Sequence, residues 1–152
     1  MDKDRRIFVT GLAGVAATLT LSACMDNPGT LTVSAQGMAG ANPGADGQDR
    51  PLTIFLLQMT GSGAFDSADF YALQNPSAAL GGELVKSDQI VLAPGGTPKK
   101  IITMQAGTTV VGIMAAFRNP AGKRFRAKTP APGNNAGILL SVGPSGLQVS
   151  DV

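Results

Sequence analysis

The chain has 152 residues, with 12 lysines and arginines against 10 aspartates and glutamates, for a formal net charge of +2. This length allows one modest domain, and so small a charge does not favour binding to nucleic acid or to an anionic membrane. Only 14% of the residues are charged, well below the usual quarter, whereas glycine and proline are frequent. The composition favours short strands joined by turns over a helical bundle.

The first two dozen residues have the pattern of an export signal. A polar stretch with three basic residues, residues 2–6, precedes an apolar run over residues 7–21. The run is about 15 residues long, which is short for a membrane-spanning helix of about 20. A basic start, a short apolar run and small residues after it are typical of signal peptides. We therefore expect residues 1–23 to be a signal peptide that is removed on export.

The apolar run ends in Leu21-Ser22-Ala23-Cys24, which has the form of the lipobox of bacterial lipoproteins. The small residues let a peptidase approach the bond before the cysteine, and the thiol carries a diacylglycerol. Cys24 is the single cysteine of the chain and has no internal disulfide partner. We predict that Cys24 is lipidated, that its three acyl chains anchor the protein without spanning the membrane, and that residues 24–29 form a tether.

Two neighbouring features concern the destination and the export route. Met25 follows the lipidated cysteine and the aspartate comes one place later, at Asp26. Because an aspartate directly after the cysteine is the inner-membrane retention signal, the outer membrane is predicted, with the body facing the periplasm. The pair Arg5-Arg6 resembles a twin-arginine export motif, so general secretory and twin-arginine export both stay open.

Short strand patterns alternate with turn signals from Thr30 to the end of the chain. The run before residue 60 is apolar on both faces, which predicts a central strand in its sheet. The loop over residues 37–50 is rich in glycine, proline, asparagine and aspartate. Seven to eight strands are predicted, over residues 30–35, 51–59, 89–92, 100–105, 108–117, 123–128, 138–142 and 147–150.

One helical segment interrupts the strands after the second of them. Residues 62–74 carry apolar side chains three to four places apart, with Ser62 or Asp66 as caps, and residues 78–84 add a turn. Asp66 and Asp69 are typical of capping at a helix start rather than of a catalytic pair. The side chains expected in the core are Phe65, Phe70, Leu73, Met104 and Met114. Residues 30–152 are therefore predicted to form an all-β domain, a β-sandwich with a short helical insertion.

Several motifs, in this order, carry a resemblance to a known family. They are Asn42-Pro43 with Asp46-Gly47 before the second strand, F-D-S-A-D-F-Y-A-L over residues 65–73, Leu92-Ala93-Pro94-Gly95, A-A-F-R over residues 115–118 and R-F-R over residues 124–126. Together with the lipobox they resemble the type VI secretion lipoprotein family TssJ (VasD/SciN-like) from about residue 31 to 149. Leu57 and Phe125 stand where many members have tyrosine and tryptophan, and both keep the position apolar.

The resemblance implies a transthyretin-like β-sandwich anchored in the outer membrane. It implies a structural protein that binds the periplasmic C-terminal region of the inner-membrane protein TssM within the type VI secretion membrane complex. It also implies partner contact through the loop over residues 37–50, with Asn42, Pro43, Asp46 and Gly47 as candidates. Asn-Pro and Asp-Gly pairs are equally ordinary turn formers, so both interpretations of the loop stay open.

A basic stretch over residues 123–128 offers a second candidate contact. Arg124 and Arg126, with lysines on either side, could face an acidic partner surface. Such a run is also typical of a solvated sheet edge that discourages unwanted strand pairing.

An enzyme is not expected. The chain contains no histidine, which removes the commonest general base and zinc ligand, and its cysteine is assigned to lipid. It carries no phosphate-binding or dinucleotide-binding motif, and no cofactor or metal site is predicted. The alternative interpretation is a periplasmic ligand- or peptide-binding β-sandwich lipoprotein, or an assembly factor of another envelope machine.

Overall fold

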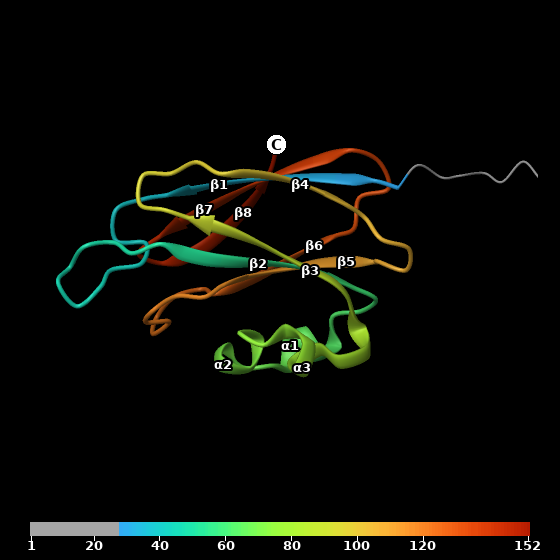
Figure 1. The fold of residues 1–152 in the computed structure, drawn as a ribbon, viewed down its shortest axis with the longest axis horizontal. Helices are drawn as coiled ribbons and strands as arrows, with labels where there is room; N and C mark the ends of the chain where they lie inside the picture. Colours follow the sequence, from blue (N-terminus) through green and yellow to red (C-terminus); the bar gives the residue numbers. More distant parts are fainter. Residues whose placement is uncertain (1–27) are drawn as a thin grey trace, which may run out of the picture.

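The computed structural model describes residues 28–152, which form two stacked four-stranded sheets (Figure 1). The strands are β1 (Thr30–Gly37), β2 (Leu52–Met59), β3 (Leu84–Leu92), β4 (Lys99–Thr103), β5 (Val110–Ala115), β6 (Arg126–Pro130), β7 (Ala136–Gly143) and β8 (Gly146–Asp151). The helices are α1 (Gly63–Ser67), α2 (Phe70–Leu73) and α3 (Pro76–Leu80), followed by the 3-10 turn η1 (Gly81–Glu83). The predicted β-sandwich with a helical insertion after the second strand is confirmed.

The predicted signal peptide, with the lipobox and Cys24, lies outside the described residues. Within residues 28–152, no helix is long and apolar enough to cross a membrane. Gly29, predicted as the last residue of the tether, is buried, and its carbonyl accepts a hydrogen bond from the Met104 amide at 2.8 Å. The folded body therefore begins directly before β1.

The two sheets have the strand orders β4-β1-β7-β8 and β3-β2-β5-β6. All neighbouring strands run antiparallel except β1 and β7, whose parallel pairing brings Leu31 opposite Ala136. Strands β3 and β4 form the open edges on one side of the sandwich. On the other side the edges β6 and β8 approach each other, and a backbone bridge joins Arg124 to Gly146.

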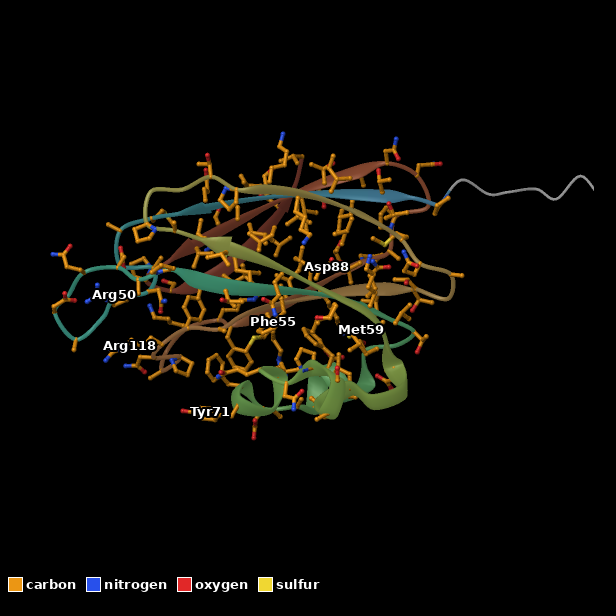
Figure 2. All side chains as sticks on the ribbon, in the orientation of Figure 1. Arg50, Phe55, Met59, Tyr71, Asp88 and Arg118 are labelled. Carbon is orange, nitrogen blue, oxygen red and sulfur yellow. The ribbon has the colours of Figure 1, made fainter. Side chains whose placement is uncertain are left out.

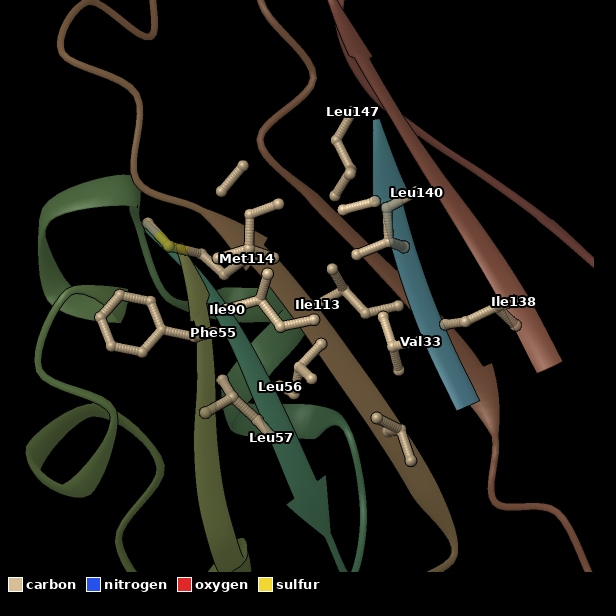
Figure 3. Close-up of a cluster of buried hydrophobic side chains, with 14 of the residues drawn as sticks. Val33, Phe55, Leu56, Leu57, Ile90, Ile113, Met114, Ile138, Leu140 and Leu147 are labelled. Carbon is tan, nitrogen blue, oxygen red and sulfur yellow. The ribbon is translucent and has the colours of Figure 1, made fainter. Parts of the chain in front are cut away.

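Alternation along the strands places one apolar row of each sheet in the space between the sheets. Figure 3 shows Val33 and Leu140 from the first sheet facing Leu56 and Ile113 from the second, and all four are fully buried. Each such side chain contributes about 1.5–3 kcal/mol through removal from water. These rows form the main core.

Strand β2 is apolar on both faces because both faces are covered. It lies between β3 and β5, as predicted for a central strand. The helices lie against the outer face of its sheet (Figure 1), and Leu57 and Met59 are fully buried on that side. Phe65, Phe70, Leu73, Met104 and Met114 are all buried, as predicted.

The helical segment is broken into three short pieces rather than continuous over residues 62–74. Ala68 and Asp69 are extended, with ψ of 144° and 173°, and the Asp69 carboxylate accepts from the Ala72 amide at 2.7 Å to start α2. Ser62 occupies the first cap position without a side-chain cap bond. The aspartate that caps is thus Asp69, because its hydrogen bond competes with continuation of α1.

Strand β5 is two residues shorter at each end than the predicted residues 108–117. The starts of two other strands differ from prediction by more, and for a common reason. Strand β3 begins at Leu84, five residues before the predicted start, and β6 begins at Arg126, three residues late. Both are edge strands of the sheet β3-β2-β5-β6. An edge strand is held mainly by backbone hydrogen bonds on one side, so its polar side chains carry little of the alternation from which a strand is predicted.

Candidate functional site

Four connections lie at the end of the sandwich opposite the start of β1. They are the β1–β2 loop (residues 38–51), the β3–β4 turn (residues 93–98), the β5–β6 linker (residues 116–125) and the β7–β8 turn. Figure 1 shows the teal loop and the orange linker at the left, whereas β1 begins at the right beside the grey trace. The loop that the sequence predicts as a contact region therefore lies at the end of the body opposite residue 28, where the described part of the chain begins.

The β1–β2 loop is organised from inside by Asp49. Its carboxylate accepts hydrogen bonds from the amide of Gly40 at 2.9 Å and from the amide of Asn42 at 3.1 Å. An isolated backbone bridge pairs Pro43 with Asp49. Because its amides and carbonyls are paired within the loop, the loop has a defined shape.

The tip of the loop is exposed. Asp46 and Arg50 form an ion pair at 2.8 Å, and both side chains are about half exposed. Such a surface pair contributes about 0–1 kcal/mol to stability. Gly47 has a φ of 79°, which a glycine adopts without steric cost. Of the predicted contact residues, Asp46 and Gly47 are exposed and Pro43 is half-buried.

Asn42, the fourth predicted contact residue of the loop, is buried, with 4% of its surface exposed. Its Nδ2 donates to the carbonyls of Arg50 at 3.4 Å and Pro51 at 3.2 Å. Its Oδ1 accepts from the Arg118 amide at 2.9 Å. The Asn42 side chain is thus used within the chain, where it joins the loop to the linker.

A hollow of about 290 Å³ lies between the β1–β2 loop and the β3–β4 turn. Its lining residues are Gly37, Met38, Ala39, Ala41, Asn42, Asp49, Arg50, Leu52, Leu92, Ala93, Pro94 and Gly95. This volume is just under the range of about 300–1,000 Å³ for small-molecule sites. None of these described residues is aromatic, and the hollow does not favour the ligand-binding alternative.

The basic stretch is mostly engaged with other parts of the chain. The Arg126 guanidinium donates to the carbonyls of Phe65 at 2.8 Å and Ala68 at 2.5 Å, which are at the end of α1. The Lys128 ammonium lies 2.7 Å from the Asp66 carboxylate. The hydrogen bond from Lys128 lowers the pKa of Asp66 below its ordinary value. Of the predicted strand over residues 123–128, only residues 126–128 lie in the edge strand β6, where Arg126 and Lys128 contact the helical insertion, and residues 123–125 belong to the linker.

Arg118 and Arg124 both lie in the linker, but their side chains reach different surfaces. Arg124 lines a second hollow, between β6 and β8, together with Lys128 and Asp151. Arg118 is exposed and lies at the same end of the molecule as Arg50 (Figure 2). Neither arginine forms an ion pair within residues 28–152. In the sequence, Arg124 belongs to the basic stretch and Arg118 lies close before it, whereas the fold directs their side chains to separate surfaces.

Lys123 is a further residue whose role the sequence did not reveal. Its Nζ donates to the carbonyls of Gly40 at 3.4 Å, Ala41 at 3.5 Å and Pro144 at 3.2 Å. It also lies 5.4 Å from the centre of the Phe117 ring. No local pattern marks this role, because the loop partners of Lys123 are more than 80 residues away in the chain.

Solved structures with the same architecture come from type VI secretion systems. The lipoprotein TssJ1 from Pseudomonas aeruginosa is 28% identical, with a TM-score of 0.75, over 82% of this chain and 97% of that one. Serratia marcescens Lip, a membrane-bound component of the system, is 27% identical with the same TM-score, over 81% and 96%.

A chain in the structure described as the TssM C-terminal domain from EAEC shares the fold at 21% identity and a TM-score of 0.65, over 81% of this chain and 98% of that one. No curated protein shows significant sequence similarity. The model of the type VI secretion lipoprotein family (VasD, EvfM, TssJ) matches residues 29–149. The chain, whose described part forms an eight-stranded sandwich, belongs to this family.

Proposed function

We propose that this protein is an outer-membrane-anchored structural lipoprotein of the type VI secretion membrane complex, which binds the periplasmic C-terminal region of a TssM-type inner-membrane protein. The observation that carries the proposal is the family match, which begins at residue 29, five residues after the lipobox cysteine. The family is one of structural lipoproteins rather than enzymes. The mechanism is mechanical: lipid holds one end of the body and a protein interface holds the other.

The position of the anchor supports this arrangement. Five residues, 25–29, separate Cys24 from β1, and a fully extended chain of that length spans about 17 Å. Strand β1 has eight residues, which at about 3.3 Å each carry the chain some 26 Å further. We propose that this places the β1–β2 loop on the periplasmic side of the body, turned away from the membrane.

The exposed tip of the loop is the proposed contact. Residues 43–48 project from a base that hydrogen bonds to Asp49 and Asn42 hold in place. A loop that is already ordered loses less conformational entropy on binding than a loop that must fold on its partner. The edge strand β6, with Arg124 directly before it, is the second candidate surface, whereas the Arg126 guanidinium is occupied by the carbonyls of Phe65 and Ala68.

A binding experiment tests the proposal. The body, residues 25–152, is mixed with the periplasmic region of the TssM-type protein from the same organism, and capture is followed by size-exclusion chromatography. A variant in which residues 44–48 become a glycine-serine linker leaves Asn42 and Asp49 in place. The matched control replaces Gly133 and Asn134, exposed residues of the β6–β7 loop at the tether end.

We expect a complex with the wild-type body and with the control, and none with the variant of the loop tip. Binding by all three proteins would move the interface to another surface, with β6 the first to test. If the wild-type body does not bind, the proposed partner is wrong, and the family membership stands by itself.

A further inference from the structure

The β1–β2 loop and the β5–β6 linker are locked together by the side chain of Asn42. Its amide nitrogen holds the end of the loop through the carbonyls of Arg50 and Pro51, and its oxygen holds the linker through the Arg118 amide. Asn42 is 4% exposed, so these hydrogen bonds lie in a place that water reaches poorly. Loss of the hydrogen bond from the Arg118 amide would leave the Oδ1 of Asn42 without a partner in this buried place, which favours the locked arrangement.

A second side chain closes the same unit from the other direction. Lys123 reaches from the linker to the loop carbonyls of Gly40 and Ala41 and to the Pro144 carbonyl in the β7–β8 turn. Three segments that are far apart in the sequence are therefore fixed against one another. The end of the sandwich is one composite surface rather than three independent loops.

The cationic side chains at this surface differ in whether they already have a partner within the chain. Arg50 is paired with Asp46 in the loop, and the Lys123 ammonium is occupied by carbonyl oxygens. Arg118 has an exposed side chain and no ion-pair partner among residues 28–152. The hydrogen bond from its backbone amide to Asn42 fixes the Arg118 backbone at the loop base, and the side chain lies at the same end of the molecule as Arg50 (Figure 2).

From this geometry we propose that the partner-facing surface is composite, with Arg118 receiving a carboxylate-bearing segment of the partner and with Asn42 and Lys123 as positioning residues. The proposal rests on the function proposed above and names the chemistry of that same contact. The guanidinium presents a planar fork of donors that matches a carboxylate. Charged groups at such a surface act mainly on the association rate and on its dependence on salt.

The test measures affinity and association rate by biolayer interferometry. The mature lipidated chain is held in detergent micelles and the periplasmic region of the TssM-type partner is in solution, at low and at high salt. We expect Arg118→Glu to weaken binding about tenfold or more and to remove most of the salt dependence. Lys86→Glu makes a like charge change on an exposed side chain of β3, opposite Gln58 and toward the tether end, and it is expected to bind within about twofold of the wild type.

Variants of Asn42 and Gln58 distinguish the positioning role of Asn42 from a general loss of stability. Asn42→Ala, which removes the hydrogen bonds to Arg50, Pro51 and Arg118, is expected to slow association and to speed hydrogen exchange of the loop amides. Gln58→Leu weakens the fold near Thr103, at the tether end, and should leave binding unchanged.

Each result decides one point. Wild-type affinity and salt dependence in both Arg118→Glu and Asn42→Ala would overturn the composite surface, and the proposed function would stand on the loop tip alone. Equal losses in Arg118→Glu and Lys86→Glu would show a diffuse charge effect and would also overturn it. Absence of wild-type binding removes the proposed partner and this inference together.

Discussion

Gln58 offers the sharpest test of how this sandwich is held together. It is a polar side chain with no exposed surface, in β2 at the centre of its sheet. Its Nε2 donates to the Thr103 carbonyl at 3.1 Å, which ties β2 to β4 of the opposite sheet. Its Oε1 accepts from the Gln105 amide at 2.7 Å and from the Thr108 hydroxyl at 3.1 Å. One side chain thus links both sheets and the β4–β5 turn.

The substitution Gln58→Leu keeps the approximate volume and removes these hydrogen bonds. The Thr103 carbonyl keeps a second donor, the Gln105 side chain at 3.3 Å, and the half-buried Thr108 hydroxyl turns to water. The Gln105 amide loses its acceptor, which costs about 1–3 kcal/mol, and the other two lost bonds add about 0.5–1 kcal/mol each. We expect the free energy of unfolding to fall by about 3 kcal/mol.

Thermal unfolding of residues 25–152, followed by circular dichroism, measures the effect. With an unfolding entropy of about 2.1 cal/mol/K per residue, a loss of about 3 kcal/mol lowers the Tm of a body of this size by about 11 °C. The control is Gln148→Leu, an exposed glutamine in β8, for which we expect a change within about 2 °C. A fall in Tm for Gln58→Leu that is no larger than in the control would refute the reasoning that these hydrogen bonds join the sheets.

Three further predictions concern the anchor, the helices and the edge strand. Cys24→Ser should move the protein from the membrane fraction to the soluble periplasmic fraction, because acyl chains attached to the thiol hold it; palmitate labelling checks the cause, and an unchanged membrane fraction would contradict lipid anchoring. Asp69→Ala should lower stability by about 1 kcal/mol through loss of the cap of α2, measured by urea unfolding, and no change would show that α2 is held by packing alone. Lys128→Met should raise the pKa of Asp66, measured by NMR titration. In the wild type that pKa is lowered in the folded state, so the stabilisation by the pair is present above about pH 4 and is lost as the pH falls through the lowered pKa.

The strand order along the chain could be predicted because local patterns carry it. Turn signals such as Asn119-Pro120-Ala121-Gly122 mark where strands stop, and this turn forms with a hydrogen bond from the Lys123 amide to the Pro120 carbonyl at 3.0 Å. The apolar run of β2 indicated a strand covered on both faces, and the hairpin of β7 and β8 followed from its turn. The break in the helix at Asp69 was missed, because an aspartate inside a helical pattern and an aspartate that caps the next helix look alike in sequence.

At the candidate site, contacts between residues far apart in the sequence could not be predicted from local patterns. Asn42 had the appearance of an exposed turn residue, since Asn-Pro is a common turn pair, yet it is buried and joined to a linker 76 residues further on. Arg124 and Arg126 belong to one basic stretch in sequence, and Arg118 lies a few residues before it. In the fold, Arg118 is exposed at the end that carries the loop, and Arg124 lines the hollow between β6 and β8. The Arg126 guanidinium donates to the carbonyls of Phe65 and Ala68 at the end of α1.

The sequence by itself determined the class of protein: a lipobox at Cys24, short alternating runs and a set of ordered motifs specify a lipoprotein with a β-sandwich body. These features could be read directly because each depends on neighbours in the chain. Only the tertiary structure decided which polar side chains are free for a partner. Hydrogen bonds over long sequence separations occupy Asn42, Lys123 and Arg126 and leave Arg118 exposed, and such bonds exist only once the two sheets have closed on their common core.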